Sequence, residues 1–318
     1  MPKLTLDQKI FEAANVIRQG GLVAFPTETV YGLAANALDA DAVAKIFELK
    51  GRPKFDPLIV HIAGIDELQP LVEHVPASAK KLVEHFWPGP LSVVLTKQSC
   101  VPDIVTAGLS SVAVRCPAHD IARRLIEAAD VPIAAPSANV FCAVSPTTAQ
   151  HVADQFGDRL PNILDGGPCD VGVESTVVSF FDEQPILLRP GGVTVEELES
   201  VIGPVSMGTT DENRSVSPGQ LPRHYSPSTP LVLTDDPLPP HSQGRVGLLS
   251  FGQPKTREGF EAIEILSAKE CLREAATNLF AAIRRLDNQQ LDLIIAQPVP
   301  ESGLGQAIMD RLRRAVAK

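Results

Sequence analysis

Residues 20–33 read Gly-Gly-Leu-Val-Ala-Phe-Pro-Thr-Glu-Thr-Val-Tyr-Gly-Leu, and this stretch decides the fold. Its apolar run, Leu22 to Phe25, is short and uncharged and lies between a glycine pair and a proline, which is typical of a strand buried on both faces. Pro26 cannot donate to a ladder, so the strand ends there, and the polar residues Thr27, Glu28, Thr29 and Tyr31 follow its carboxyl end, where open α/β sheets bind ligands. On spacing alone a second interpretation stays open, in which Thr27 and Glu28 only cap the next helix.

Composition limits the class of protein. The chain has 318 residues, enough for two domains, and a net charge of −10, which argues against wrapping a long nucleic acid. No uncharged apolar run approaches about 18 residues, so we expect no membrane span. The N-terminus lacks the apolar core of a signal peptide, and the five cysteines form no C-x-x-C pair. These features predict a cytoplasmic protein without structural zinc.

Apolar periodicity predicts alternating helices and strands over residues 1–202. A capping box at Thr5 starts a helix that ends at Gly20. The other expected helices cover 40–50, 77–86 and 121–129, and the expected strands cover 58–62, 91–95 and 112–117. The stretches 131–139, 172–179 and 186–191 each combine a strand with a polar end.

The densest basic stretch is Lys50-Gly51-Arg52-Pro53-Lys54, between a helix and a strand. Prolines keep these cations close, so their fields add, as a polyphosphate site requires. The alternative is a solvated loop, but the position of the stretch favours a site. His61 on the following strand is either a packed core histidine or a substrate contact.

Several other strand ends carry hydroxyl or guanidinium groups, and together they indicate a small-molecule site that binds anions. An arginine in an apolar run, such as Arg115, needs a carboxylate or phosphate partner. The stretch Ser145-Pro146-Thr147-Thr148 has the pattern of a helix start, which favours either an anion or a simple cap. There is no Walker loop, no G-x-G-x-x-G and no legible catalytic triad.

Residues 203–230 lose periodicity and are rich in Ser, Pro and Gly, which predicts a linker. Its Arg-His-Tyr at 223–225 is unusual for a spacer, and we expect it to fold over the site as a lid. From Leu231 onward strands (231–234, 246–250, 291–296) alternate with helices (269–286, 305–316). The predicted domains are therefore 1–202 and 231–318, joined by the linker 203–230.

The motifs taken in order resemble the L-threonylcarbamoyladenylate synthases, in their longer two-domain form. The resemblance rests on residues 25–33, 50–53, 57–61, 87–90, 135–139, 172–176 and 188–191, and on the Ser-Pro-Gly linker with Arg-His-Tyr at 223–225 and residues 303–309. It implies an α/β fold in which a twisted, mixed, open sheet with helices (YrdC-like) is joined by a Pro-rich linker to a smaller, Rossmann-like α/β domain.

The resemblance also implies a reaction. L-Threonine, bicarbonate or CO2, and ATP give threonylcarbamoyl-AMP and pyrophosphate, for N6-threonylcarbamoyladenosine at position 37 of tRNA. Mg²⁺ would accompany ATP, held chiefly by phosphates and water. A downstream threonylcarbamoyl transferase would use the product, and direct contact of this chain with RNA stays open. No covalent enzyme intermediate is needed, which agrees with the missing nucleophile motif.

Site residues follow from the same resemblance. Lys50 and Arg52 would be catalytic, stabilising charge on the departing pyrophosphate. The implied threonine and carbamate contacts are Thr29, His61, Arg115, Ala135 and Ser175. The implied ATP contacts are Lys50, Arg52, Asp56, Ser111, Ser137, Ser145, Arg189 and Tyr225, and no metal ligand is implied. Family members often carry Asn at the position of Asp56 and Met-Lys-Tyr at 220–222.

Two other functions remain as alternatives. One is an RNA-binding module without catalysis that uses the basic residues 50–54, against which the acidic net charge counts. The other is a carbamoyltransferase that takes its group from carbamoyl-AMP and uses another acceptor, although such proteins tend to carry extra transferase domains.

Overall fold

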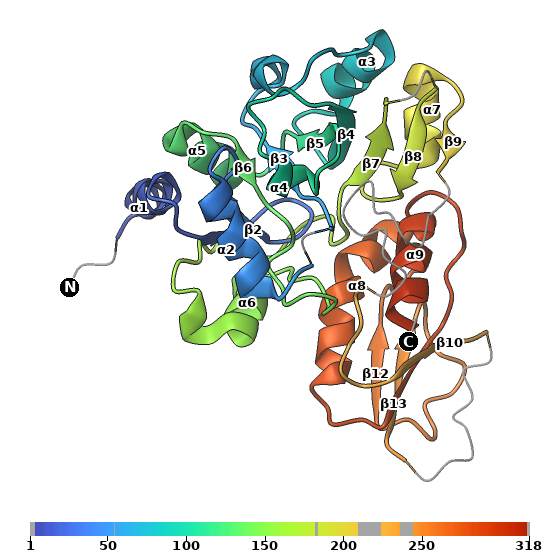
Figure 1. Cartoon of the computed structure of the whole chain (residues 1–318). Coiled ribbons are helices and arrows are strands. Elements are labelled where there is room, and N and C mark those ends of the chain that lie inside the picture. Colours follow the sequence, from blue (N-terminus) through green and yellow to red (C-terminus); the bar gives the residue numbers. More distant parts are fainter. Residues whose placement is uncertain (1–3, 54, 182–183, 209–223, 236–243, 317–318) are drawn as a thin grey trace.

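The computed structural model describes residues 4–53, 55–181, 184–208, 224–235 and 244–316. These residues form a nine-stranded sheet and a four-stranded sheet, each with its own helices (Figure 1). The predicted two-domain α/β fold is confirmed. None of the helices within these ranges is long and apolar enough to cross a lipid bilayer.

The large sheet is mixed, as predicted, with the strand order β1-β2-β6-β3-β5-β4-β7-β8-β9. Strands β3 and β5 are parallel, as are β4 and β7, whereas β4 and β5 are antiparallel. The strands are β1 (Val23–Phe25), β2 (Gly32–Asn36), β3 (Ile59–His61), β4 (Leu91–Thr96), β5 (Ser111–Arg115), β6 (Ile133–Ala134), β7 (Thr176–Ser179), β8 (Ile186–Arg189) and β9 (Ser206–Met207).

Strand β1 is buried on both faces, as its apolar sequence predicts. Val23 and Phe25 pack into one hydrophobic cluster and Ala24 into another, because successive side chains point to opposite faces of a strand. The residues after β1 turn back into β2, which pairs with β1 antiparallel. The interpretation that Thr27 and Glu28 cap a helix is therefore wrong, because the next element is a strand.

Helices cover both faces of this sheet. The first, α1 (Leu6–Arg18), begins at the predicted capping box of Thr5 and Gln8. The others are α2 (Ala40–Lys50), α3 (Ala77–Phe86), α4 (Asp103–Thr106), α5 (Asp120–Ala129), α6 (Ala149–Phe156) and α7 (Val195–Ile202), with short 3-10 turns η1 (Ile65–Glu67), η2 (Gln69–Leu71) and η3 (Gly157–Arg159).

The second domain is a parallel sheet in the order β10-β13-β11-β12, which agrees with the predicted Rossmann-like α/β unit. Its strands are β10 (Leu231–Leu233), β11 (Val246–Ser250), β12 (Ala262–Ile265) and β13 (Leu293–Ala296), and its helices are α8 (Leu272–Asp287) and α9 (Leu304–Val316). In Figure 1, α8 and α9 lie between this sheet and the first domain. Their hydrophobic cluster includes Val30, Val144 and Val173 of the first domain, so the two domains share buried apolar surface.

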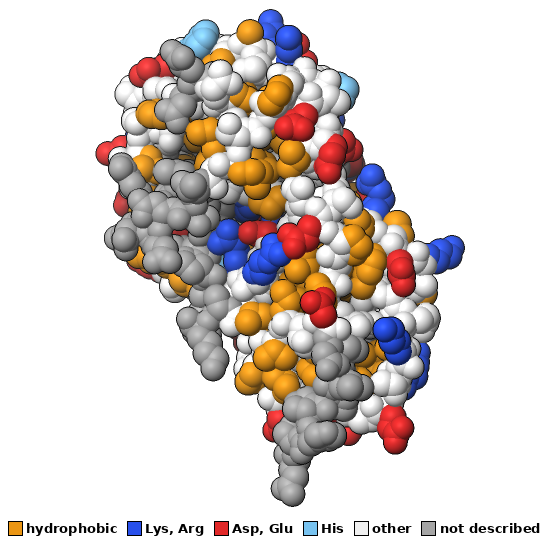
Figure 2. Space-filling model, turned by 90° about the vertical axis from the view of Figure 1, so that its right-hand side faces the viewer, with side chains coloured by type: hydrophobic (Ala, Val, Ile, Leu, Met, Phe, Trp, Pro, Cys, Tyr) orange, Lys and Arg blue, Asp and Glu red, His pale blue; other side chains and the backbone are white. Residues whose placement is uncertain are grey.

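The predicted linker is described only at its two ends. Strand β9 belongs to the large sheet although it lies beyond residue 202. Residues 209–223, which include the predicted lid residue Arg223, lie outside the described residues, while His224 and Tyr225 lie within them. Figure 2 faces the side of β8, β9 and α9 and shows basic and acidic side chains together midway between the two domains.

Candidate active site

A row of polar residues crosses one end of the large sheet. His61 at the end of β3 pairs with Arg115 at the end of β5. The register of β4 and β5 places Ser92 next to Arg115. Ser92 pairs with Val177 of β7, and Val177 pairs with Arg189 at the end of β8. Because the sheet is mixed, carboxyl ends of some strands and amino ends of others meet at this end of the sheet.

The turn after β1 supplies hydroxyl groups to the site. The Thr27 hydroxyl donates to the backbone oxygen of Val30 at 2.6 Å and accepts from the backbone nitrogens of Thr29 and Val30, both at 3.2 Å. The side-chain oxygens of Thr27 and Thr29 lie 2.8 Å apart. These local hydrogen bonds fix the turn, so Thr29 is held before any ligand binds.

Arg115 contacts this turn directly. Its Nη1 donates to the Thr29 hydroxyl at 2.9 Å, and its Nη2 lies 2.7 Å from a carboxylate oxygen of Glu28. Both charged side chains are almost fully buried. The partner that the apolar run around Arg115 requires is therefore Glu28. A second carboxylate approaching Arg115 would share the guanidinium with it.

His61 is both a core residue and a pocket residue. It is 3% exposed, its Nδ1 lies 3.2 Å from the backbone oxygen of Ile59, and its ring meets Phe25 edge to face. Burial, and then the charge of Arg115, lower the pKa of His61 to about 3. The imidazole is therefore neutral near pH 7.

Arg52 enters the pocket because helix α2 ends at Gly51. That residue has a φ of 63°, a left-handed conformation that glycine adopts without strain. The Arg52 guanidinium donates to the backbone oxygens of Asp56 (3.2 Å) and Pro57 (2.9 Å) and lies 2.9 Å from the Asp56 carboxylate. Asp56 is fully buried and serves as a counter-charge for Arg52.

Lys50 is buried next to the pocket without lining it. Its Nζ donates to the backbone oxygens of Ser137 (2.6 Å) and Asn139 (2.5 Å), which belong to the polar tip after β6. Burial, and then the charge of Arg52, hold the pKa of Lys50 well below its ordinary value. Lys50 therefore fixes Ser137 in place.

On the far side of the row, Arg189 holds Ser175. Its guanidinium donates to the Ser175 backbone oxygen at 2.9 and 3.1 Å and to the Ser175 hydroxyl at 3.1 Å. The hydroxyls of Ser175 and Ser92 lie 2.8 Å apart. Burial lowers the pKa of Arg189.

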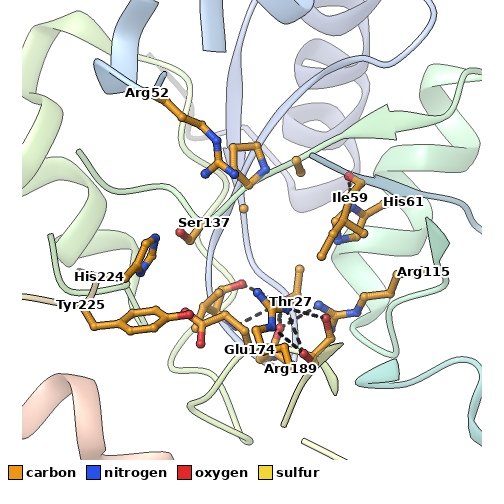
Figure 3. Close-up of a pocket in the computed structure, with 16 residues that line it drawn as sticks. Thr27, Arg52, Ile59, His61, Arg115, Ser137, Glu174, Arg189, His224 and Tyr225 are labelled. Carbon is orange, nitrogen blue, oxygen red and sulfur yellow. Dashed lines mark hydrogen bonds between the residues drawn. The ribbon is translucent and has the colours of Figure 1, made fainter. Parts of the chain in front are cut away.

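His224 and Tyr225 close the pocket from the segment that follows the undescribed residues. Both side chains are buried, and Tyr225 has a φ of 61°, a strained conformation for a residue other than glycine. Burial, and then Glu174, raise the pKa of Tyr225 to about 12, whereas burial and then Arg52 lower that of His224, so both are neutral. In Figure 3 they enter opposite His61 and Arg115. The free space in the pocket is only about 50 Å³.

Nine of the residues implied by the resemblance line this one pocket. They are Thr29, Arg52, His61, Arg115, Ala135, Ser137, Ser175, Arg189 and Tyr225. Four others do not line it, namely Lys50, Asp56, Ser111 and Ser145. Ser111 begins β5, and the Ser145 hydroxyl donates to Glu174 at 2.6 Å.

Glu28 and Glu174 are site residues that the sequence analysis did not assign, and His224 was expected only as part of the lid. Glu174 and His224 line the pocket, and Glu28 pairs with Arg115. Glu174 is held by Arg311, which lies 137 residues further along the chain. Because a buried carboxylate needs a counter-charge, a positively charged partner could have been expected. The local spacing in the sequence does not show which residue that partner is.

The carboxylates near the pocket do not form a metal site. The residues placed by the structure contain no group of three or more His, Cys, Asp or Glu side chains that could hold an ion. Glu28, Asp56 and Glu174 are each paired with an arginine. These residues therefore do not fit a protein-ligated cation.

Fold and site define a two-domain α/β protein with a small-molecule pocket lined by guanidinium and hydroxyl groups. Two family models match, Sua5_yciO_yrdC, described as telomere recombination, over residues 15–191, and the C-terminal domain of threonylcarbamoyl-AMP synthase over residues 193–317.

Similar proteins cover nearly the whole chain. Threonylcarbamoyl-AMP synthase of Pyrococcus abyssi is 45% identical over 324 residues, covering 96% of this chain and 94% of the relative. That of Bacillus subtilis is 44% identical over 327 residues, covering 98% and 94%. The crystal structure of P. abyssi Sua5 with L-threonine aligns with a TM-score of 0.90 and 43% identity, covering 99% of this chain and 96% of that one. The chain belongs to the threonylcarbamoyl-AMP synthase family and is an enzyme.

Proposed function

We propose that this protein condenses L-threonine, bicarbonate or CO2, and ATP to threonylcarbamoyl-AMP and pyrophosphate. The observation that carries the proposal is the pocket itself, in which Arg115, Thr29, Arg52 and Arg189 line one small space. The relatives' names and the threonine-bound structure support it. The product would serve a downstream threonylcarbamoyl transferase that forms N6-threonylcarbamoyladenosine at position 37 of tRNA.

Threonine would bind at the Arg115 end. Its carboxylate would share the guanidinium with Glu28, and hydroxyls of Thr29 and Ser175 would contact its polar atoms. Because His61 is neutral, it adds no charge that would repel a protonated amine. After giving its proton to water, the amine forms a bond to the carbon of CO2 and releases a second proton to water, which leaves a carbamate. Ala135 is small enough to leave room for it. A carbamate oxygen then attacks the α-phosphorus and expels pyrophosphate, so catalysis consists mainly of positioning.

ATP would bind between Arg52, Ser137 and Arg189. Arg52 would stabilise the charge of the departing pyrophosphate, because positively charged donors fixed before the reaction favour the transition state. Lys50 uses two of its three ammonium hydrogens on backbone oxygens, so one remains for a phosphate oxygen. The negative phosphates would favour the charged form of Lys50.

Ser145 would play a different part. Its hydroxyl hydrogen is committed to Glu174 at 2.6 Å, so toward ATP it can only accept a hydrogen bond. The ribose hydroxyls and the adenine amino group are the donors that ATP offers. We therefore assign Ser145 to the nucleoside end rather than to the phosphates. Asp56 would act on ATP only through Arg52, and Ser111 has no role that we can assign.

Mg²⁺ would arrive with ATP and be held by phosphate oxygens and water, since the carboxylates near the pocket are already paired with arginines. When bound, it would reduce the negative charge of the triphosphate. We place the reaction in the cytoplasm, because the five cysteines of the sequence form no C-x-x-C pair, which suits a reducing compartment.

Both substrates need more room than the pocket offers, because ligand pockets are usually several hundred Å³ and this space is about 50 Å³. We propose that the segment carrying His224 and Tyr225 moves to admit them. The Ser226 amide donates to the Cys142 backbone oxygen at 2.8 Å, so its hydrogen exchange reports this contact. An ATP analogue should accelerate that exchange, and unchanged exchange would count against the movement.

Neither alternative function is favoured by these observations. An RNA-binding surface at residues 50–54 would need exposed cations, but Lys50 is 1% and Arg52 is 6% exposed, while Lys54 lies outside the described residues. The carbamoyltransferase alternative has no support from the two family models, neither of which is described as a carbamoyltransferase.

The decisive assay incubates the protein with ATP, labelled bicarbonate and one amino acid at a time. A labelled adenylate should form with threonine, and much less with serine, which lacks the methyl group, or valine, which lacks the hydroxyl. Equal labelling with every amino acid, or labelling without any, would contradict the proposed function. A gel shift with tRNA in the absence of turnover would instead support the RNA-binding alternative.

A further inference from the structure

Glu174 places a negative charge at the edge of the proposed ATP site. It lines the pocket and is 7% exposed, directly before Ser175. Burial alone would raise its pKa, but the charges of Arg311 and Arg189 more than offset this and hold it below its ordinary value. Glu174 is therefore an anion beside the position where a triphosphate would bind.

The counter-charge comes from the other domain. Arg311 lies on α9 with no exposed surface, and its Nε donates to a Glu174 carboxylate oxygen at 3.0 Å. Its Nη1 donates to the Pro190 backbone oxygen at 2.5 Å, directly after Arg189. Its guanidinium also lies 5.5 Å from the centre of the Tyr225 ring. One side chain of the second domain thus contacts three segments that form the pocket.

We propose that Arg311 is a positioning residue of the catalytic pocket, which balances the Glu174 charge beside the ATP site and so makes the second domain part of the active site. This inference rests on the proposed function. If Arg311 is lost, the Glu174 carboxylate lies beside the phosphates without its main positive partner. Glu174 is then less firmly held, and so is the Ser145 hydroxyl that donates to it.

Other contacts hold the second domain against the first without involving the Glu174 carboxylate. Arg284 of α8 donates to the backbone oxygens of Val144 and Ser145, and the Thr277 hydroxyl donates to the Asp170 backbone oxygen at 2.7 Å. None of these contacts involves Arg311. The domains should therefore stay together in an Arg311 variant, and its effect should be electrostatic.

The pH dependence follows from the groups that face Glu174. The charges of Arg311 and Arg189 act on Glu174, the charge of Glu174 acts on Tyr225, and Asp310 pairs with Arg311. Removing Arg311 takes away the larger positive charge, so the Glu174 pKa rises toward the value that burial alone would give. In that variant, Glu174 loses its proton as the pH rises through its raised pKa, and kcat/KM for ATP should fall over the same pH interval. The wild type should show no such fall.

The test compares Arg311→Met, Arg311→Lys and the double variant Arg311→Met/Glu174→Gln. Arg311→Met should lower kcat/KM for ATP by about 30-fold or more, as expected when one member of a buried charge pair is removed. Arg311→Lys should recover part of the loss. The double variant should recover more and lose the pH-dependent fall, because no unbalanced carboxylate remains. Arg313→Met is the matched control, since Arg313 pairs with Glu301 at the exposed surface of the same helix.

The outcomes separate this inference from the proposed function. If the wild type makes no threonylcarbamoyl-AMP, the proposed function fails. If it does, and Arg311→Met keeps full activity or the double variant shows no recovery and the same pH profile as the single variant, the positioning role is overturned. Binding of a non-hydrolysable ATP analogue by calorimetry gives a second readout, which should weaken in Arg311→Met and recover in the double variant.

Discussion

Replacing Arg52 by alanine tests whether this guanidinium acts in the reaction or only in the fold. Its side chain is 3% exposed, bonds two backbone oxygens and pairs with Asp56, whose side chain has no exposed surface. Removing one partner of a buried ion pair costs about 3–5 kcal/mol of folding free energy. Loss of a positioned transition-state donor lowers the rate by about 10²- to 10³-fold. Arg52→Ala should show both effects.

A second variant separates the two effects. Arg52→Ala/Asp56→Ala also removes the carboxylate that would otherwise stay buried without Arg52, so much of the unfolding free energy should return. The rate should remain low, because the charge that we propose faces the pyrophosphate is still missing. Urea unfolding gives the stability, and threonine-dependent pyrophosphate release gives the rate.

The control is Arg285→Ala, because Arg285 pairs with Glu264 on the surface of the second domain and is half exposed. A pair of this kind contributes about 0–1 kcal/mol. If the double Arg52/Asp56 variant recovers activity together with stability, the reasoning is wrong, because Arg52 would then act only through the fold.

Three further predictions follow from the geometry. Arg115→Met should raise the KM for threonine at least about tenfold while leaving ATP analogue binding within a factor of a few, since a charged hydrogen bond contributes about 1.5–3 kcal/mol; equal losses for both ligands would contradict the assignment. His61 has its folded pKa lowered to about 3, below the unfolded value of 6.5, so stability falls as pH drops from 6.5 toward 3. Urea unfolding of His61→Gln should show a dependence weaker by up to about 1.4 kcal/mol per pH unit, and an unchanged slope would exclude the buried neutral state. Gly172→Ala should destabilise the domain contact far more than Gly167→Ala, because both have positive φ but only the Gly172 Cβ would lie 2.4 Å from the Thr277 backbone; equal melting temperatures of the two variants would refute this.

The sequence predicts well the elements whose signals are local. Helix α2 has the predicted bounds, Ala40–Lys50, because its apolar face and the glycine after it are adjacent in the chain. Strand β2 was not predicted, because Gly-Leu-Ala-Ala-Asn has no β-branched residue and its strand conformation comes from pairing with β1 and β6.

The same distinction between local and long-range signals applies to the site residues. Arg115 and Arg189 are visible from the sequence as arginines that end apolar runs. Their neighbours are not, because the contacts of Arg115 with Thr29 and of Arg311 with Glu174 join residues 86 and 137 positions apart. The assignment of Lys50 as a direct phosphate ligand also depends on tertiary structure, since its amine is already bonded to the tip after β6. That assignment stays a prediction.

The most direct test of the central claim is a crystal structure of this protein with L-threonine and a non-hydrolysable ATP analogue bound together. We predict the threonine carboxylate on Arg115, the triphosphate between Arg52 and Arg189, and the threonine nitrogen close enough to the α-phosphate for a carbamate to bridge them. Ligands in separate places, or a triphosphate that avoids both Arg52 and Arg189, would contradict the account.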